Sequence, residues 1–143
     1  MKNDSALFFV CSLIEFIGRA QKQERSKVVE FLGEETIRHI YNYADVLHCE
    51  PIEKVADEFI TRKQIPVGTF DNVADCKYQV PDYWTIGEIF ERLIEDIMDE
   101  DAVATLVTVY SSWLTKEISN FNSDLFYQPR DYLKVCWEEK KIA

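Results

Sequence analysis

Carboxylates gather in one stretch of this chain and are the residues best placed to act together. Residues 81–101 carry eight acids against one base, a net charge of −7, within a chain of 143 residues whose net charge is −10. On a helix with 100° between successive residues, five of these acids fall within an arc of about 140° opposite the apolar side chains. They are Glu88, Glu91, Glu95, Asp96 and Asp99. Such a stripe is a candidate docking surface for a basic partner, although a solvated outer face has the same pattern.

Aromatic side chains near the expected loops form a second candidate interface. Tyr and Trp are common anchors of protein–protein interfaces because they bury a large area at a low cost in conformational entropy. The candidates are Tyr83, Trp84, Phe126 and Tyr127. Burial in the core is the simpler role for such residues in a chain that is 47% hydrophobic.

Residue types that support catalysis or metal binding are sparse. His48 and Cys49 are adjacent, but neighbours on a helix point about 100° apart and rarely share a metal ion. The chain has no HExxH motif, no CxxC pair and no phosphate-binding glycine loop. We therefore expect no metal, no cofactor and no enzymatic activity. The alternative is a small-molecule-binding or enzymatic domain with a pocket near the segment 64–84, around His48, Asp75 and Tyr83.

The negative charge also constrains partners and location. A chain with 26 acids and 16 bases repels phosphate, so direct binding to nucleic acid or to an anionic membrane is disfavoured. The apolar run near the N-terminus contains Glu15 and is too short for a transmembrane helix. The four cysteines are scattered and follow no secretory leader. These features predict a cytoplasmic protein with reduced thiols.

The elements that must position these residues are helical. Apolar residues recur at i, i+3, i+4 and i+7 along most of the chain. The expected helices run over about 4–21, 27–32, 34–48, 51–60, 85–98, 102–121 and 129–141. We predict an all-α fold, a single compact bundle of six or seven helices with one long packed loop at about 64–84. Residues 1–143 form one domain, with 1–63 and 85–143 as possible subdivisions.

Polar residues mark where several of these helices begin. Asp4 or Ser5 can cap the first helix, and Asp99, Glu100 and Asp101 end the acidic helix and can cap the next one. Thr85 and Glu88 have the spacing of a capping box, which predicts that the acidic helix begins at Thr85.

Basic residues cluster after the first helix. The cluster consists of Arg19, Lys22, Arg25 and Lys27. Cations near a helix C-terminus are favoured by the helix dipole, so we expect these side chains to lie in a solvated loop.

The order of segments in the first 60 residues resembles a known family. The segments that carry the resemblance are Leu7–Glu15, Lys27–Leu32, Ile40–His48 and Val55–Ile60. Over residues 5–60 the chain is similar to short, uncharacterised helical proteins of gut-dwelling Firmicutes. Members of that family are encoded beside ADP-ribosyltransferase-like toxins and are suspected antitoxins. The resemblance implies no catalytic residues.

Together these observations predict a non-catalytic protein-binding module that docks on and neutralises a partner, as antitoxins and phage anti-defence inhibitors do. The partner would be basic, either a nucleic-acid-binding protein whose binding surface the stripe occupies or a toxin. A homo-oligomer whose exposed aromatic side chains form a symmetric interface is a further possibility.

Overall fold

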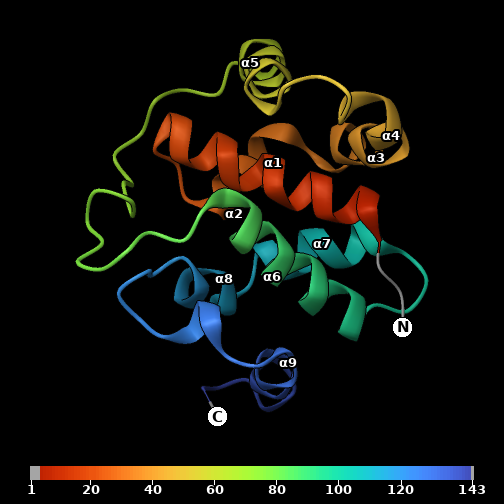
Figure 1. The fold of residues 1–143 in the computed structure, drawn as a ribbon. Helices are drawn as coiled ribbons and strands as arrows, with labels where there is room; N and C mark the ends of the chain where they lie inside the picture. The colour runs from red at the N-terminus through yellow and green to blue at the C-terminus, as the bar shows by residue number, and fades with distance from the viewer. Residues whose placement is uncertain (1–3, 143) are drawn as a thin grey trace.

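The computed structural model describes residues 4–142, and its regular structure in that range is entirely helical (Figure 1). The helices are α1 (Ser5–Gln21), α2 (Arg25–Leu32), α3 (Glu34–Asn42), α4 (Ala44–Leu47), α5 (Ile52–Lys63), α6 (Tyr83–Ile97), α7 (Ala102–Tyr110), α8 (Trp113–Ile118) and α9 (Arg130–Glu139), with a 3-10 turn, η1, at Leu125–Tyr127. The predicted all-α fold class is confirmed. Within residues 4–142, nine α-helices replace the expected six or seven because two of the predicted helices are each broken once.

Both breaks have a local cause that the apolar pattern does not show. The helix expected over 34–48 is interrupted at Tyr43, whose φ of −111° departs from helical geometry and whose ring packs against His39. The helix expected over 102–121 ends at Ser111. There the hydroxyls of Ser112 and Thr115 donate to the Val109 carbonyl at 2.6 and 2.7 Å, which replaces helical hydrogen bonds with side-chain ones.

Aspartates cap the three helices that carry most of the core. Asp4 accepts a hydrogen bond from the Leu7 amide at 3.0 Å, and Asp101 accepts one from the Ala104 amide at 3.0 Å, so each cap is one of the residues predicted for that helix. The predicted capping box is wrong, because α6 begins at Tyr83 and its cap is Asp82. The Thr85 amide donates to the Asp82 carboxylate at 2.7 Å, so Thr85 lies inside the first turn.

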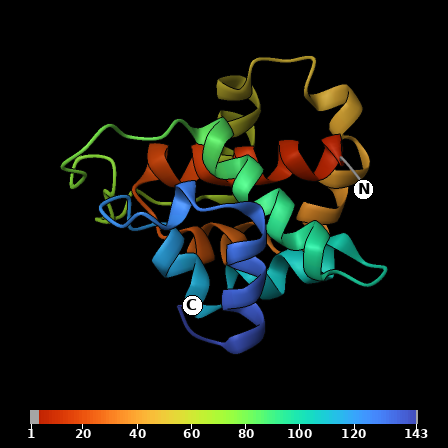
Figure 2. The ribbon, with the colours of Figure 1, turned by 60° about the horizontal axis from the view of Figure 1, so that its bottom comes forward.

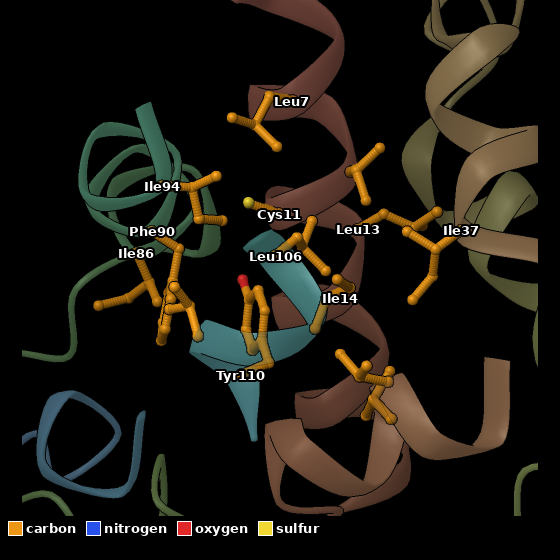
Figure 3. Close-up of a cluster of buried hydrophobic side chains, with 14 of the residues drawn as sticks. Leu7, Cys11, Leu13, Ile14, Ile37, Ile86, Phe90, Ile94, Leu106 and Tyr110 are labelled. Carbon is orange, nitrogen blue, oxygen red and sulfur yellow. The ribbon is translucent and has the colours of Figure 1, made fainter. Parts of the chain in front are cut away.

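Helix α1 runs through the centre of the molecule, and α6 crosses it (Figures 1 and 2). The crossing is close because it is made at small residues: a Cβ added at Gly87 would lie 2.2 Å from the Ser12 hydroxyl oxygen. Apolar side chains from α1 and α3 meet those of α6 and α7 in one cluster (Figure 3). The core thus includes residues from both of the possible subdivisions.

The segment 64–82 is an irregular loop that packs on the C-terminal end of α1. The Gly68 and Phe70 amides donate to the Gln21 and Lys22 carbonyls at 2.7 and 2.9 Å. A Cβ at Gly68 would lie 2.6 Å from the Lys22 carbonyl oxygen, so glycine permits this contact. The expectation of a packed rather than a free loop agrees with these contacts.

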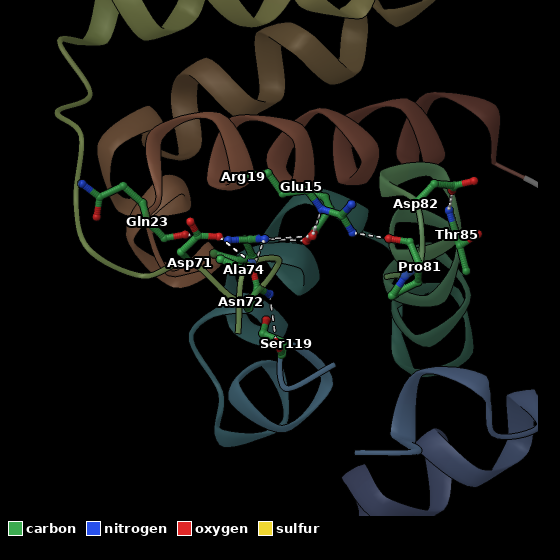
Figure 4. A network of polar contacts seen from close by, with 11 residues as sticks. Glu15, Arg19, Gln23, Asp71, Asn72, Ala74, Pro81, Asp82, Thr85 and Ser119 are labelled. Atoms are coloured by element: carbon green, nitrogen blue, oxygen red, sulfur yellow. Dashed lines mark hydrogen bonds and ion pairs between the residues drawn. The ribbon is translucent and has the colours of Figure 1, made fainter. Parts of the chain in front are cut away.

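A buried polar network holds the loop in place (Figure 4). The Arg25 guanidinium donates to both Glu15 carboxylate oxygens at 2.9 Å and to the Asn72 side-chain oxygen at 3.0 Å. Asn72 in turn donates to the Ser119 carbonyl at 2.9 Å. Burial alone would raise the pKa of Glu15, but Arg25 and Arg19 together hold it below its usual value.

This network corrects the prediction of a solvated basic cluster. Arg25 is 1% exposed and Arg19 pairs with Glu15 at 2.8 Å, whereas Lys22 and Lys27 remain exposed. The apolar periodicity of α1 does not indicate the burial of Arg25. The reason is that Glu15, its partner, lies on a face of α1 that neighbouring segments cover.

Candidate functional site

The five acids predicted to form one exposed stripe do not share one environment. Glu88 and Asp99 are exposed on α6 and just beyond it. Glu91 is only 3% exposed. Glu95 and Asp96 accept hydrogen bonds from Arg130 of α9 at 3.1 and 2.8 Å. The expectation of a continuous carboxylate surface on this helix is therefore wrong.

The reason is that α6 has neighbours on more than one side. It packs against α1, α7 and α9, whereas the sequence pattern of this helix predicts a core on a single side. The buried positions of α6 are Ile86, Gly87, Phe90, Glu91, Leu93 and Ile94. At 100° per residue they cover an arc of about 160°, which extends to the edge of the expected acidic face.

Carboxyl groups outnumber guanidinium groups where α9 packs on α6. One guanidinium, Arg130, faces the carboxyl groups of Glu91, Glu95 and Asp96. Burial raises the pKa of Glu91 to about 8, and the hydrogen bond to Glu95 and its negative charge act in the same direction. A proton held on Glu91 relieves the excess of carboxylates at this contact.

Glu95 also fixes the start of α1. It accepts a hydrogen bond from the Asp4 amide at 2.7 Å, and Asp4 accepts one from the Tyr41 hydroxyl at 2.6 Å. Burial, followed by the hydrogen bond to Asp4, raises the pKa of Tyr41 to about 12. Glu95 therefore links α6 directly to α1 and α9, and through Asp4 to α3. Its carboxylate stabilises the contacts between these helices.

A cleft elsewhere on the molecule is lined in part by exposed side chains. It lies between the first turns of α1, the α4–α5 segment and the first turn of α6, and its volume is about 670 Å³. Figure 2 shows the first turns of α6 beside α1, near α5. This volume falls within the range of about 300–1,000 Å³ that is typical of ligand pockets.

Aromatic rings form one wall of the cleft. The rings of Phe8 and Trp84 lie 5.4 Å apart, and those of Tyr83 and Trp84 lie 4.9 Å apart. Trp84 is 38% exposed, although it belongs to this packed cluster. Asp82 sets the position of this wall because it caps α6 immediately before Tyr83. The wall offers apolar surface to a second molecule.

Carboxylates form the opposite rim. Asp45, Glu50 and Glu53 line the cleft and are exposed, and the described lining contains neither lysine nor arginine. Glu50 is 3.3 Å from Lys54 on the surface of α5, whereas Asp45 and Glu53 have no ion pair among the described residues. An apolar wall that faces an acidic rim can bind a group that is apolar and positively charged.

The two parts of the predicted aromatic interface separate in the structure. Tyr83 and Trp84 line the cleft. Phe126 and Tyr127 lie in η1, where Phe126 packs edge-on against Phe121 at 6.1 Å and Tyr127 is 69% exposed. The alternative pocket is likewise divided: His48 and Tyr83 line the cleft and Asp75 does not.

The adjacent His48 and Cys49 side chains bond to their own helical segment. The His48 Nδ1 atom lies 3.0 Å from the Ala44 carbonyl oxygen, and the Cys49 thiol lies 3.6 Å from that of Asp45. Among residues 4–142, no group of three or more His, Cys, Asp or Glu side chains is arranged to hold a metal ion.

Several cleft residues were missed in the sequence. Phe8, Asp45, Glu50 and Glu53 line the cleft, and none of them is among the site residues predicted from the sequence. One usable signal was the apolar character of α1 on more than one face, which implies a face that another element or another molecule must cover. The acids of the rim had no comparable signal in the sequence, because Asp45 lies on α4, Glu50 in the 48–51 turn and Glu53 on α5.

Comparison with protein families, with curated proteins and with solved structures gave no match for this chain. Within the part of the chain that the structure describes, no helix combines the length and the hydrophobicity that a membrane span requires.

Proposed function

We propose that this chain is a non-catalytic, acidic protein-binding module that docks on a basic partner protein through the cleft and neutralises it. The single observation that carries the proposal is the juxtaposition of an aromatic wall, in which half-buried Phe8 packs on exposed Trp84, with an exposed acidic rim in which Asp45 and Glu53 have no ion pair among the described residues. The exposed acids of α6, Glu88 and Asp99, are secondary contacts in this proposal.

Side chains next to the cleft support a protein partner. Tyr43 is 53% exposed and Val46 is 63% exposed, and both lie at the short helix α4, whose Asp45 lines the cleft. Exposed large apolar side chains beside a concave site are typical of interfaces, where aromatic anchors contribute most of the binding energy. A partner of larger extent than a metabolite would cover both the cleft and these residues.

The charge of the chain supports a basic partner, either a toxin or a nucleic-acid-binding protein. A net charge of −10 accelerates association with a positively charged surface and disfavours phosphate and anionic lipid. The resemblance to suspected antitoxins covers residues 5–60, which supply α1, α4 and α5 of the cleft. All four cysteines are free thiols, which supports a location in the cytoplasm.

A small apolar cation is the second candidate for the cleft, because the volume of about 670 Å³ suits one. Such a ligand would fill the cleft without contacting Tyr43 or Val46. Binding that responds to changes at Trp84 and is unaffected by removal of the Tyr43 and Val46 side chains would favour this second candidate.

The test is affinity capture from the native host with matched variants. The cleft variant Asp45→Asn/Glu50→Gln/Glu53→Gln and the control variant Glu35→Gln/Asp57→Asn/Glu117→Gln each remove three exposed acids, so both change the net charge from −10 to −7. We expect the wild type and the control variant to capture the same basic protein and the cleft variant to lose it. Equal loss by both variants would show that the total charge, and not the cleft, is responsible.

A further inference from the structure

We infer that the cleft receives a single amphipathic, basic α-helix of the partner, with one apolar side chain against Phe8 and Trp84 and flanking Lys or Arg side chains at Asp45, Glu50 and Glu53. This inference rests on the proposed function and names the part of the partner that docks. It follows from the shape of the cleft, its charge and the secondary structure around it.

The aromatic wall defines the anchor. Trp84 is packed on Phe8 and Tyr83 on one side and is 38% exposed on the other, so its ring is already held in place and still accessible. An aliphatic or aromatic side chain placed against it removes apolar area from both molecules. This burial costs little conformational entropy in the cleft, because the neighbouring rings already hold Trp84 in place.

The acidic rim defines the charge of the occupant. Three exposed carboxylates, Asp45, Glu50 and Glu53, line a site whose described lining carries no cationic side chain. Basic groups that flank the anchor would be paired there, whereas acidic groups would face like charges. A neutral apolar segment would bind the wall and leave the rim unpartnered.

The occupant is expected to be helical, because the described part of the chain offers no sheet edge with which an extended peptide could pair. No strand occurs among residues 4–142, and the cleft is lined by helices and by the short 48–51 turn. An extended peptide would find no ladder of main-chain partners here, and its own amides and carbonyls would be desolvated without hydrogen bonds. A helix satisfies its main chain internally and presents side chains alone, which is the established mode of helix-in-groove recognition.

Synthetic peptides of about 16 residues test the inference without the natural partner, since that length holds roughly four helical turns. The probe is a stapled peptide with leucine at i, i+3, i+4 and i+7 and lysine on its flanks. One comparison peptide replaces lysine with glutamate, a second scrambles the order, and a third carries two central prolines. Binding is measured by titration calorimetry.

We expect the stapled basic peptide to bind the wild type and the Glu35→Gln/Asp57→Asn/Glu117→Gln control alike. Its affinity should fall at least roughly tenfold for the cleft variant Asp45→Asn/Glu50→Gln/Glu53→Gln and for Trp84→Ala. Circular dichroism of each variant verifies folding. The triple cleft variant changes exposed side chains only, so it keeps the test valid if Trp84→Ala does not fold.

Two results would overturn the inference. Equal affinity for the scrambled or proline peptide would show that helicity is not recognised, and equal loss in the cleft and control variants would show simple charge attraction. If the natural partner is captured through the cleft but no helical peptide binds, the helix inference fails and the proposed function stands. If peptides bind and no basic partner is captured from the host, the proposed function fails.

Discussion

Two acidic regions of this molecule use their charges in different ways. On α6, Glu91 is buried, and Glu95 and Asp96 lie under α9 and share the guanidinium of Arg130. At the cleft, Asp45 and Glu53 are exposed and unpaired among the described residues. The comparison teaches that the density of acids along a sequence does not locate a binding surface. The carboxylates that can bind a partner are those that the fold leaves exposed and without an ion pair or hydrogen bond inside the protein.

Removal of the guanidinium at α9 tests the enclosed region and should have the largest effect on stability. Arg130→Ala leaves Glu95 and Asp96, which are 5% and 17% exposed, without their cation. We expect a loss of about 2–4 kcal/mol in the free energy of unfolding, measured by urea denaturation. Arg92→Ala is the matched control: its pair with Glu88 is exposed, so we expect a loss below about 1 kcal/mol. Equal losses would show that the enclosure by α9 has no energetic importance.

The proton on Glu91 gives the same region a distinctive pH dependence. Because the folded pKa of about 8 lies above the ordinary value for glutamate, the folded state binds the extra proton and stability falls as pH rises between about 4.5 and 8. Glu91→Gln mimics the protonated carboxyl. We expect the variant to match the wild type near pH 4.5 and to exceed it in stability by an amount that grows steadily as the pH rises to 8.

The groups that face Glu91 are Glu95 and Arg92 on its own helix, Arg130 on α9 and Cys11 on α1. Because the two proteins differ only at position 91, the difference between their stability curves isolates this carboxyl. A constant difference across the pH range would show that Glu91 is ionised throughout and that the excess of carboxylates is not relieved by a proton.

The cap of α6 links the stability of the helix to the cleft. Asp82→Ala removes the acceptor of the Thr85 amide, so we expect a loss of roughly 1 kcal/mol and weaker partner binding through a displaced Tyr83–Trp84 wall. Thr85→Ala is the matched change, and it should cost less because Thr85 is already within the helix. Thermal unfolding of both variants provides the measurement. A larger loss for Thr85→Ala than for Asp82→Ala would show that Thr85, and not Asp82, caps the start of the helix.

Charge reversal compares the exposed acids of the two regions and should change stability least. Glu88→Lys/Asp99→Lys on the α6 side and Glu50→Lys/Glu53→Lys at the cleft each move the net charge from −10 to −6, since each substitution adds two. We expect each pair to alter the free energy of unfolding by less than about 1 kcal/mol. Partner binding should weaken mainly for the cleft pair, measured at low and high salt because screening reduces exposed electrostatic attraction.

The helices and most of their ends could be predicted because local information determines them. The apolar repeat places the starts of α1 and α7 correctly, and the capping residues Asp4 and Asp101 are among those that the sequence offered for these helices. The start of α6 was misplaced because Asp82 and Thr85 are both good capping residues, and only the observed backbone distinguishes them.

The site could not be predicted to the same degree, because it depends on contacts between segments far apart in the sequence. The position of Glu91 depends on where α9 packs, and the cleft requires Phe8, Glu53 and Trp84 to come together from three helices. The burial of Arg25 has the same origin, since its partners Glu15 and Asn72 lie on a different helix and in the long loop. Periodicity reports that a face is buried, but it does not identify the neighbour that buries it.

The comparison between the two acidic regions is tested most directly by photo-crosslinking of the bound partner. A benzoylphenylalanine is introduced at Glu53 on the cleft rim or at Glu88 on α6, two exposed positions on the surface of their helices. After irradiation in the native host, crosslinked proteins are identified by mass spectrometry. Our prediction is that one basic protein is crosslinked strongly from position 53 and more weakly from position 88, which is a secondary contact. Crosslinks to that protein from position 88 alone would contradict it and assign binding to the acidic helix.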